Sequence, residues 1–551
     1  MSNSIALPAL PVSERVAGWL GRFLHSPWAL CLAIALAFCL NVGSLPLTDV
    51  DEGAFSEATR EMMARGNLVS PTLNGQPRHD KPILIYWAQA ASVAVFGVEE
   101  FAFRLPSLLA AVLWLWALHR FCRRHVDRET AQVAALVLAL SLLVGIVARA
   151  AIADALLNLW LALAMFAVYD YDAAVRQGED ERAIGPILLA AYTALGLGFL
   201  TKGPVAVLFP ALVGVFYLGW CGQWRSLRRA ALFWPGWLLF VAIVLPWHVL
   251  VYLDQGDAFF RGFYLQHNVN RYASTFEGHG GNPFYYLLAL PLIVLPFTGW
   301  LFVAARGIGR AALRDEIDSR LTRFLLCWFG VVFVFFSLSR TQLPHYLLYG
   351  ATPLFILCAL QRQALTRRVW LFAPALALLA LIALSPQLAE LMLPLVTRPL
   401  ENAVLTAYTA AFAGWPQAAA VLALLLVFGL AAWRGLPTYQ TLLLVGLLQA
   451  ATFGGFVAPA VLGSTQQGVR EAAAFAQAEG LAVVAWRVNL PSFSVYRQAE
   501  TPQRLPKIGE TALTRPDRLP ELAAAVAPAR LDPIFSRGLV VLARVLPEDE
   551  R

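Results

Sequence analysis

Stretches of about 20 mostly apolar residues recur along almost the whole chain, and they restrict its fold more than any other feature. A helix of about 20 residues crosses the apolar core of a bilayer, so each stretch predicts a membrane span. Only 14% of the 551 residues are charged, compared with about 25% in soluble domains. We therefore predict an α-helical polytopic membrane protein with thirteen spans. The spans are predicted at residues 28–47, 103–122, 130–147, 152–171, 187–201, 204–220, 233–253, 285–305, 322–338, 345–361, 369–385, 416–433 and 440–459.

Arginine residues concentrate in alternate loops between these spans, as in 120–128 and 225–229. Positively charged loops are retained in the cytoplasm during insertion. The first predicted span follows Arg15 and Arg22 and lacks a small-residue cleavage site, so we interpret it as a retained anchor with a cytoplasmic N-terminus. An odd number of spans then places the C-terminus on the outer side.

Three longer polar segments fall on the outer side in this threading, at residues 48–101, 254–284 and 460–551. The last one combines a helix-like run with two strand-like runs, which is typical of a small mixed α/β domain. We predict a transmembrane domain over residues 1–459, with outer loops 48–101 and 254–284, followed by an outer α/β domain over 460–551.

The net charge of +7 is spread in small groups between apolar segments, so it indicates membrane topology and not a nucleic-acid-binding surface. The six cysteines all lie in or beside apolar runs. Neither a disulfide framework nor a zinc-finger spacing is expected.

Four acidic residues fall within Asp49–Glu57, directly after the first span. Such a cluster is often a helix cap, because carboxylates are favourable at helix N-termini. A catalytic role is the alternative, with Asp51 as the candidate. A second candidate, Asp154, lies at the outer start of a span, where an unpaired carboxylate is costly. We expect Asp154 to face a polar cavity and to pair with Arg149 or a lysine, either as a structural ion pair or as a substrate contact.

The chain has only three lysines, and two of them, Lys81 and Lys202, fall at the predicted outer membrane boundary. An ammonium group there can bind a phosphate as a compact point charge. The alternative is interfacial snorkelling of the side chain. Near the tenth span, Arg340 and Tyr346 repeat the combination of basic and aromatic residues.

The outer loop 254–284 gathers His267, Arg271, Glu277 and His279. The Arg271 guanidinium is suited to a phosphate. The two histidines, with Glu277 or Asp80, have ligand chemistry suited to a divalent ion such as zinc, although their spacing matches no sharp metal motif. Hydrogen-bonded loop histidines are the alternative.

Six short motifs occur together on the predicted outer face, and their order resembles a known family. They are Asp51-Glu52, Asp80-Lys-Pro82, Phe103-Arg-Leu-Pro-Ser107, Thr201-Lys-Gly203, His267 with Arg271, and Leu343-Pro-His-Tyr346. The sequence resembles the membrane glycosyltransferases of the type C fold from end to end, and most of all the 4-amino-4-deoxy-L-arabinose lipid A transferases, which are related to the protein O-mannosyltransferases.

The resemblance implies transfer of aminoarabinose from undecaprenyl phosphate to a lipid A phosphate on the periplasmic side of the inner membrane, which protects against cationic peptides such as polymyxin. It implies catalytic roles for Asp51 and Asp154 and a donor-phosphate site with Lys81 and Arg271. Lys202, Arg340 and Tyr346 are further candidates for that phosphate site. The expected partners are the undecaprenyl-phosphate-linked sugar, lipid A and membrane lipids, without nucleic acid.

The chain departs from the family pattern at two positions. Ala54 stands where a basic residue is expected after the acidic pair, and Asp80 stands where Glu is expected. The first difference weakens the expected donor-phosphate site, and both leave a different sugar open. A protein O-mannosyltransferase-like enzyme is the main alternative. A lipid transporter is favoured less, because such proteins commonly use internal repeats with sites near the midplane of the bilayer.

Overall fold

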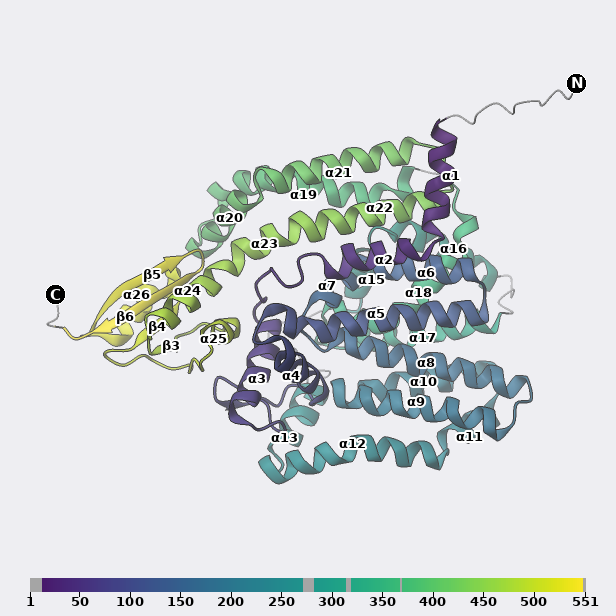
Figure 1. Cartoon of the computed structure of the whole chain (residues 1–551), viewed down its shortest axis with the longest axis horizontal. Helices are drawn as coiled ribbons and strands as arrows, with labels where there is room; N and C mark the ends of the chain where they lie inside the picture. The colour runs from purple at the N-terminus through teal and green to yellow at the C-terminus, as the bar shows by residue number, and fades with distance from the viewer. Residues whose placement is uncertain (1–11, 271–281, 314–318, 367–368, 549–551) are drawn as a thin grey trace, which may run out of the picture.

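The computed structural model describes residues 12–270, 282–313, 319–366 and 369–548. It is a bundle of long helices with a small α/β region at one end (Figure 1). The helices that precede the gap at 271–281 are α1 (Val12–Leu24), α2 (Pro27–Ile34), η1 (Ala35–Cys39), α3 (Asp51–Arg65), α4 (Leu84–Phe96), α5 (Glu100–His125), α6 (Arg128–Leu140), α7 (Leu142–Arg149), α8 (Asp154–Arg176), α9 (Glu181–Lys202), α10 (Val205–Trp220), α11 (Trp224–Ala231), α12 (Trp234–Gln255), α13 (Ala258–Phe260) and η2 (Arg261–Asn270).

The second half of the bundle continues with helices of more varied length. They are α15 (Tyr285–Ile293), α16 (Thr298–Leu313), α17 (Arg320–Leu338), η3 (Pro344–Gly350), α18 (Thr352–Leu360), η4 (Arg362–Ala364), η5 (Val369–Leu371), α19 (Ala373–Met392), η6 (Leu393–Leu395), α20 (Pro399–Phe412), α21 (Trp415–Ala432), α22 (Thr438–Thr452), η7 (Phe453–Val457) and α23 (Ala458–Thr465).

Every predicted span overlaps helical structure, although the helical part of span 28–47 ends at Cys39, and the count of thirteen is not reproduced by length and hydropathy alone. Within the described ranges, seven helices are long and apolar enough to cross a membrane. The number rises to ten if each of three bent pairs of helices is counted as one span. The bends have local causes. The predicted span 285–305 turns by 120° between α15 and α16, where Pro296 cannot donate a backbone hydrogen bond.

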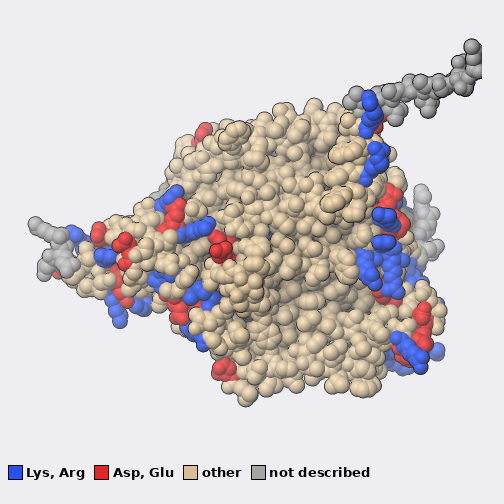
Figure 2. All heavy atoms as spheres, in the orientation of Figure 1, with Lys and Arg blue, Asp and Glu red and all other residues tan. Residues whose placement is uncertain are grey.

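The space-filling view supports a membrane-spanning bundle. A broad band without charged side chains crosses its middle, and Lys, Arg, Asp and Glu gather at its two ends (Figure 2). Charged side chains avoid the hydrocarbon core because their desolvation there is costly. We call the end that carries α3, α4 and the sheet the α3 end (Figure 1).

The C-terminal region forms a four-stranded sheet in the order β3-β4-β6-β5, with helices packed against it. β3 and β4 are parallel, and β6 pairs antiparallel with both β4 and β5. Val483, Leu513, Leu542 and Phe493 belong to a core separate from that of the bundle. The elements are α24 (Gln467–Ala478), β3 (Val483–Ala485), α25 (Pro491–Arg497), β4 (Thr511–Thr514), η8 (Pro516–Arg518), α26 (Leu519–Val526), β5 (Arg530–Arg537) and β6 (Val540–Leu546).

The C-terminal region docks on the outer loop through α25, which packs against α3. Gly53 allows this approach, because a Cβ atom there would lie 2.6 Å from the backbone nitrogen of Ser492. Asp49 accepts hydrogen bonds from the Ser492 backbone N–H at 2.9 Å and from its hydroxyl at 2.5 Å. Burial raises the pKa of Asp49 to about 7, although these hydrogen bonds act in the opposite direction. This contact places the C-terminal region beside the start of α3.

Candidate active site

A cavity of about 1140 Å³ lies at the α3 end. Its lining comes from the start of α3, the outer loop, the ends of α8 and α9, η2, η3 and the C-terminal region. The charged or aromatic lining residues are Asp51, Phe55, Arg78, His79, Asp80, Lys81, Asp154, Lys202, His267, His345, Tyr346 and Arg504. Seven residues predicted from the sequence therefore share one cavity, which are Asp51, Asp80, Lys81, Asp154, Lys202, His267 and Tyr346.

Asp51 is the member of the acidic cluster that faces this cavity. Its neighbours are engaged elsewhere, since Asp49 bonds Ser492, Glu52 pairs with Arg104 and Glu57 pairs with Arg60 at 2.6 Å. Asp51 itself is exposed and is the first residue of α3. α3 begins after Val50 without a side-chain cap hydrogen bond, and Asp51 and Glu52 are the acidic residues of its first turn, so a place at the helix N-terminus and a functional role are compatible at Asp51.

Lys81 and Arg78 lie on either side of Asp80. The Lys81 ammonium is 2.6 Å from Asp80 Oδ1, and an Arg78 nitrogen is 3.0 Å from Asp80 Oδ2. Burial alone would raise the pKa of the Asp80 carboxyl, but Lys81 and Arg78 outweigh burial and hold that pKa well below its usual range. Asp80 is therefore ionised, and it fixes both cations at the cavity wall.

Asp154 lies in a second buried cluster, which is formed by residues of α8, α9 and η3. Its Oδ1 accepts hydrogen bonds from Lys202 at 2.7 Å and from the Tyr349 hydroxyl at 2.5 Å. His345 Nε2 lies 3.7 Å from the same oxygen. Of the two partners expected for Asp154, the lysine is present, whereas Arg149 donates to the backbone carbonyls of α7 and η1, including Ala37 O at 2.8 Å. Asp154, Lys202 and His345 all line the cavity.

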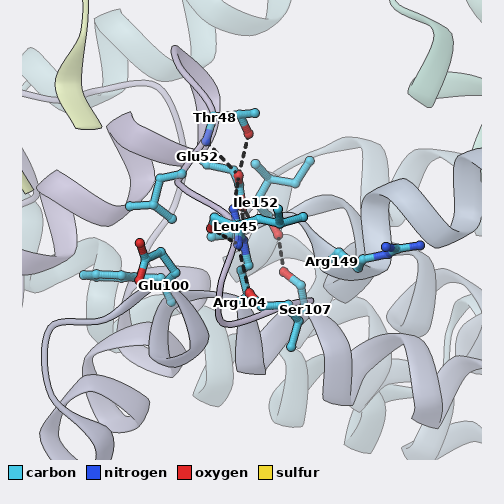
Figure 3. Close-up of polar contacts among 12 residues, drawn as sticks. Leu45, Thr48, Glu52, Glu100, Arg104, Ser107, Arg149 and Ile152 are labelled. Atoms are coloured by element: carbon cyan, nitrogen blue, oxygen red, sulfur yellow. Dashed lines mark hydrogen bonds and ion pairs between the residues drawn. The ribbon is translucent and has the colours of Figure 1, made fainter. Parts of the chain in front are cut away.

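A buried ion pair between Glu52 and Arg104 lies beside the segments that carry the candidate catalytic carboxylates, and Figure 3 shows the pair with its hydrogen-bond partners. Both side chains are 4% exposed. Glu52 follows Asp51 directly, and it accepts a hydrogen bond at 2.7 Å from the backbone N–H of Ala151, three residues before Asp154. The segment that carries Asp51 and the segment that carries Asp154 are thus joined through one carboxylate.

Arg104 also anchors the chain that leads from the first span into α3. Its guanidinium donates to the carbonyls of Val42, Leu45 and Pro46 at 2.7 to 2.9 Å. Thr48 donates to Glu52 from its backbone N–H at 2.9 Å and from its hydroxyl. The polar atoms of the Glu52 and Arg104 side chains are thus hydrogen-bonded. A buried charge pair is tolerated under this condition.

An apolar groove of about 540 Å³ adjoins the cavity. Its wall includes Leu208, Phe263, Leu265, Phe335 and Phe336. The groove and the cavity share five lining residues, which are Asp80, Lys81, Lys202, His267 and Tyr346. A hydrocarbon chain in the groove would therefore end at the cations of the cavity.

The remaining predicted residues divide into two groups. Arg340 is exposed and is not among the cavity-lining residues, because its neighbours Ser339 and Thr341 turn inward and line the groove. Arg271, Glu277 and His279 lie outside the described residues.

Three residues that line the cavity were not predicted from the sequence. They are Arg78, His79 and Arg504. Arg78 and His79 directly precede Asp80, so the basic residues beside the Asp80-Lys-Pro82 motif are the signal that points to them. Arg504 comes from the C-terminal region, and no local signal connects it with the outer loop.

The divalent ion stays a prediction. His267 Nδ1 is 3.3 Å from Asp80 Oδ1, but Asp80 already faces two cations, which disfavours a dication there. In the described part of the chain, no three His, Cys, Asp or Glu side chains are grouped as for a metal site. If the ion binds, elemental analysis of the purified protein should find it in stoichiometric amount, and loss of His267 should remove it. Metal-free active protein would contradict the prediction.

Comparisons with known proteins place these observations in a family. A family model described as dolichyl-phosphate-mannose-protein mannosyltransferase matches residues 80–250. An undecaprenyl phosphate-alpha-4-amino-4-deoxy-L-arabinose arabinosyl transferase of Aeromonas salmonicida is 32% identical over 409 residues, 70% of each chain. Enzymes of the same name from Shewanella sediminis and Pseudomonas aeruginosa are 30% and 32% identical. The Shewanella alignment covers 60% of this chain and 58% of the relative, and the Pseudomonas alignment covers 65% of each.

Solved structures show the same fold. ArnT from Cupriavidus metallidurans bound to undecaprenyl phosphate superposes with a TM-score of 0.75 at 21% identity, over 96% of this chain and 98% of that one. The apo oligosaccharyltransferase of Archaeoglobus fulgidus gives 0.51 at 13% identity, over 88% and 65%. The predicted type C membrane glycosyltransferase fold is confirmed. The chain belongs to the family of undecaprenyl phosphate-alpha-4-amino-4-deoxy-L-arabinose arabinosyl transferases.

Proposed function

We propose that this protein transfers 4-amino-4-deoxy-L-arabinose from undecaprenyl phosphate to a phosphate of lipid A, at the periplasmic face of the bacterial inner membrane. The observation that carries the proposal is the junction of an apolar groove with a cation-lined cavity. A polyprenyl phosphate sugar has the same two parts, a hydrocarbon tail and an anionic phosphate that carries the sugar. The names of the relatives support this choice of donor and sugar.

In the proposed reaction, an acceptor phosphate oxygen attacks C1 of the sugar. The bond between C1 and the carrier phosphate oxygen breaks, and its electron pair stays on that oxygen. A monoanionic phosphodiester thus becomes a dianionic phosphate monoester, so cations beside the leaving group stabilise the transition state more than the ground state. Lys81 has the position for this role, and Arg271 is the second candidate from the sequence. Direct displacement inverts the configuration at C1.

Asp51 has two possible tasks that depend on the acceptor. A lipid A phosphate is already ionised near neutral pH and needs orientation more than a general base. Asp51 would then position the acceptor or pair with the amine of the sugar. With a hydroxyl acceptor, Asp51 would act as the general base that removes the hydroxyl proton. Asp154 is held by Lys202 and Tyr349 and positions that cation at the cavity.

The product would carry less negative charge on lipid A, because the amine of the sugar offsets a phosphate. Cells that express the gene should therefore resist polymyxin and other cationic peptides. Mass spectrometry of lipid A from cells with and without the gene tests the function, and one added aminoarabinose on a phosphate is the expected difference. A peptide acceptor assayed in parallel distinguishes protein glycosylation, the activity named by the matching family model. Transfer to peptide without transfer to lipid A would replace the proposal.

The proposed orientation predicts that the α3 end faces the periplasm. In a variant without the six native cysteines, a new cysteine at Ala64 or at Glu479 should react with an impermeant thiol reagent added to intact spheroplasts. A cysteine at Gln177, which lies at the opposite end of α8 from Asp154, should react only after lysis. All three positions are exposed, so accessibility within the fold does not bias the comparison. Labelling of Gln177 alone in intact spheroplasts would reverse the orientation.

A further inference from the structure

The cluster of Arg78, Asp80 and Lys81 holds two cations on one carboxylate. The side chains are 12%, 23% and 13% exposed, so all three are largely shielded from solvent. Two cations and one carboxylate leave these three residues with one unit of positive charge. A net positive charge in a poorly hydrated wall is costly unless an anion neutralises it. The cluster thus matches the single negative charge of a phosphodiester.

Arg78 is fixed by contacts on three sides. Its Nε donates to the Tyr86 hydroxyl at 3.0 Å, and one terminal nitrogen donates to Asp80 at 3.0 Å. Its guanidinium carbon lies 5.3 Å from the centre of the Phe55 ring. A guanidinium has five N–H donors in a rigid fork, and within the described residues these two hydrogen bonds are the ones that the Arg78 guanidinium makes. The group is therefore oriented and still has donors for a ligand in the cavity that it lines.

Arg78 lies beside the residues of α3 that line the cavity. Ala54 and Phe55 line the cavity next to Asp51, and Arg78 lies over the Phe55 ring. The Ala54 side chain has no charge, so α3 supplies no cation at this point. Arg78 approaches the same part of the wall from the outer loop.

We propose that Arg78 is a phosphate-binding residue for the polyprenyl-phosphate donor. Together with Lys81, it binds the phosphate next to Asp51, and Asp80 holds both cations at the correct spacing. This inference rests on the proposed function and deepens it, because it assigns the donor phosphate to a specific pair of cations. The planar fork suits two oxygens of one phosphate, whereas Lys81 acts as a point charge.

Two measurements on purified protein test the proposal, the affinity for undecaprenyl phosphate and the rate of sugar transfer at limiting donor. Arg78→Gln should weaken undecaprenyl phosphate binding about 10- to 100-fold, the effect of losing a charge-assisted hydrogen bond. Arg78→Lys keeps the charge but loses the fork, so it should fall between Arg78→Gln and the wild type. Arg65→Gln is the matched control, because Arg65 pairs with Glu500 and is not among the cavity-lining residues. It should bind as the wild type does.

The most decisive test moves the guanidinium from position 78 to position 54. In the double variant Ala54→Arg with Arg78→Gln, a guanidinium returns to the same wall from α3. Binding should recover at least about tenfold over Arg78→Gln alone. A folded Arg78→Gln protein with wild-type affinity would overturn the proposal, and so would equal losses in Arg78→Gln and in Arg65→Gln.

A failure of the Arg78 assignment can be distinguished from a failure of the proposed function. If the wild type binds undecaprenyl phosphate but transfers no aminoarabinose to lipid A, the function fails while the binding assay still decides the role of Arg78. If the wild type transfers the sugar and Arg78→Gln is unaffected in binding and in rate, the function stands and the assignment of Arg78 fails. Thermal unfolding of each variant identifies any that are misfolded, and Arg78→Lys then provides the test.

Discussion

Replacing Lys81 with alanine should reduce sugar transfer by about a hundredfold or more, which corresponds to a few kcal/mol of lost transition-state stabilisation. Lys81 lies where the apolar groove meets the cavity, so its ammonium is placed for the phosphate that gains charge as the sugar leaves. Asp80 would remain with Arg78 as its other cation, so the local fold should persist. The loss should appear in transfer rate and in donor affinity, with membrane insertion unchanged.

The chain offers a matched control for Lys81. Lys507 lies in the C-terminal region and is not among the lining residues of the cavity. Lys507→Ala should transfer sugar at the wild-type rate. Lys81→Arg tests the geometry, since a guanidinium keeps the charge but is larger and planar. A well-folded Lys81→Ala protein with a rate near that of the wild type would place the donor phosphate elsewhere.

Replacing Arg104 with methionine should lower the free energy of unfolding by about 3–5 kcal/mol, because it leaves the buried Glu52 carboxylate without its counter-ion. It also removes the donors that satisfy three backbone carbonyls. Thermal unfolding of detergent-purified protein measures the change. Sugar transfer should fall too, since Glu52 joins the segments that carry Asp51 and Asp154.

The double variant Glu52→Leu with Arg104→Met separates charge from packing. Replacing both partners of a buried pair by apolar groups is often less harmful than removing one, so the double variant should be more stable than Arg104→Met alone. Arg398→Ala is the control, because Arg398 pairs with Glu401 on the surface and such pairs contribute little. Equal stability of Arg104→Met and Arg398→Ala would contradict the role of the buried pair.

The bundle was predictable because its signal is local. An apolar run long enough to cross a bilayer specifies a helix by itself, whatever its neighbours are. The breaks in these helices were harder to predict. The predicted span 345–361 divides into η3 and α18, with Pro353 in the first turn of α18, where its ring interrupts backbone hydrogen bonding. The short buried strand β4 and the largely exposed β5 also gave no clear alternation.

The site was predictable only where its residues stand out against their own segment. Asp154 and Lys202 are charges beside apolar spans, and their pairing follows from the cost of leaving either alone. The sequence alone does not show which carboxylate within Asp49–Glu57 faces the cavity. Asp49 and Glu52 are bound by Ser492 and Arg104, which are distant in sequence, so the answer required the fold. The position of Arg504 at the cavity also could not be predicted from the sequence, because it depends on how the C-terminal region docks on α3.

Transfer by the purified protein in detergent or liposomes is the most direct test of the central claim. The assay supplies undecaprenyl phosphate aminoarabinose with an isotope label in the sugar, lipid A as acceptor, and no other protein. The account predicts labelled lipid A that carries the sugar on a phosphate with inverted configuration at C1, together with released undecaprenyl phosphate. It also predicts that Lys81→Ala forms both products about a hundredfold or more slowly than the wild type, while Lys507→Ala forms them at the wild-type rate. Folded wild-type protein that binds the donor and leaves lipid A unlabelled would contradict the account.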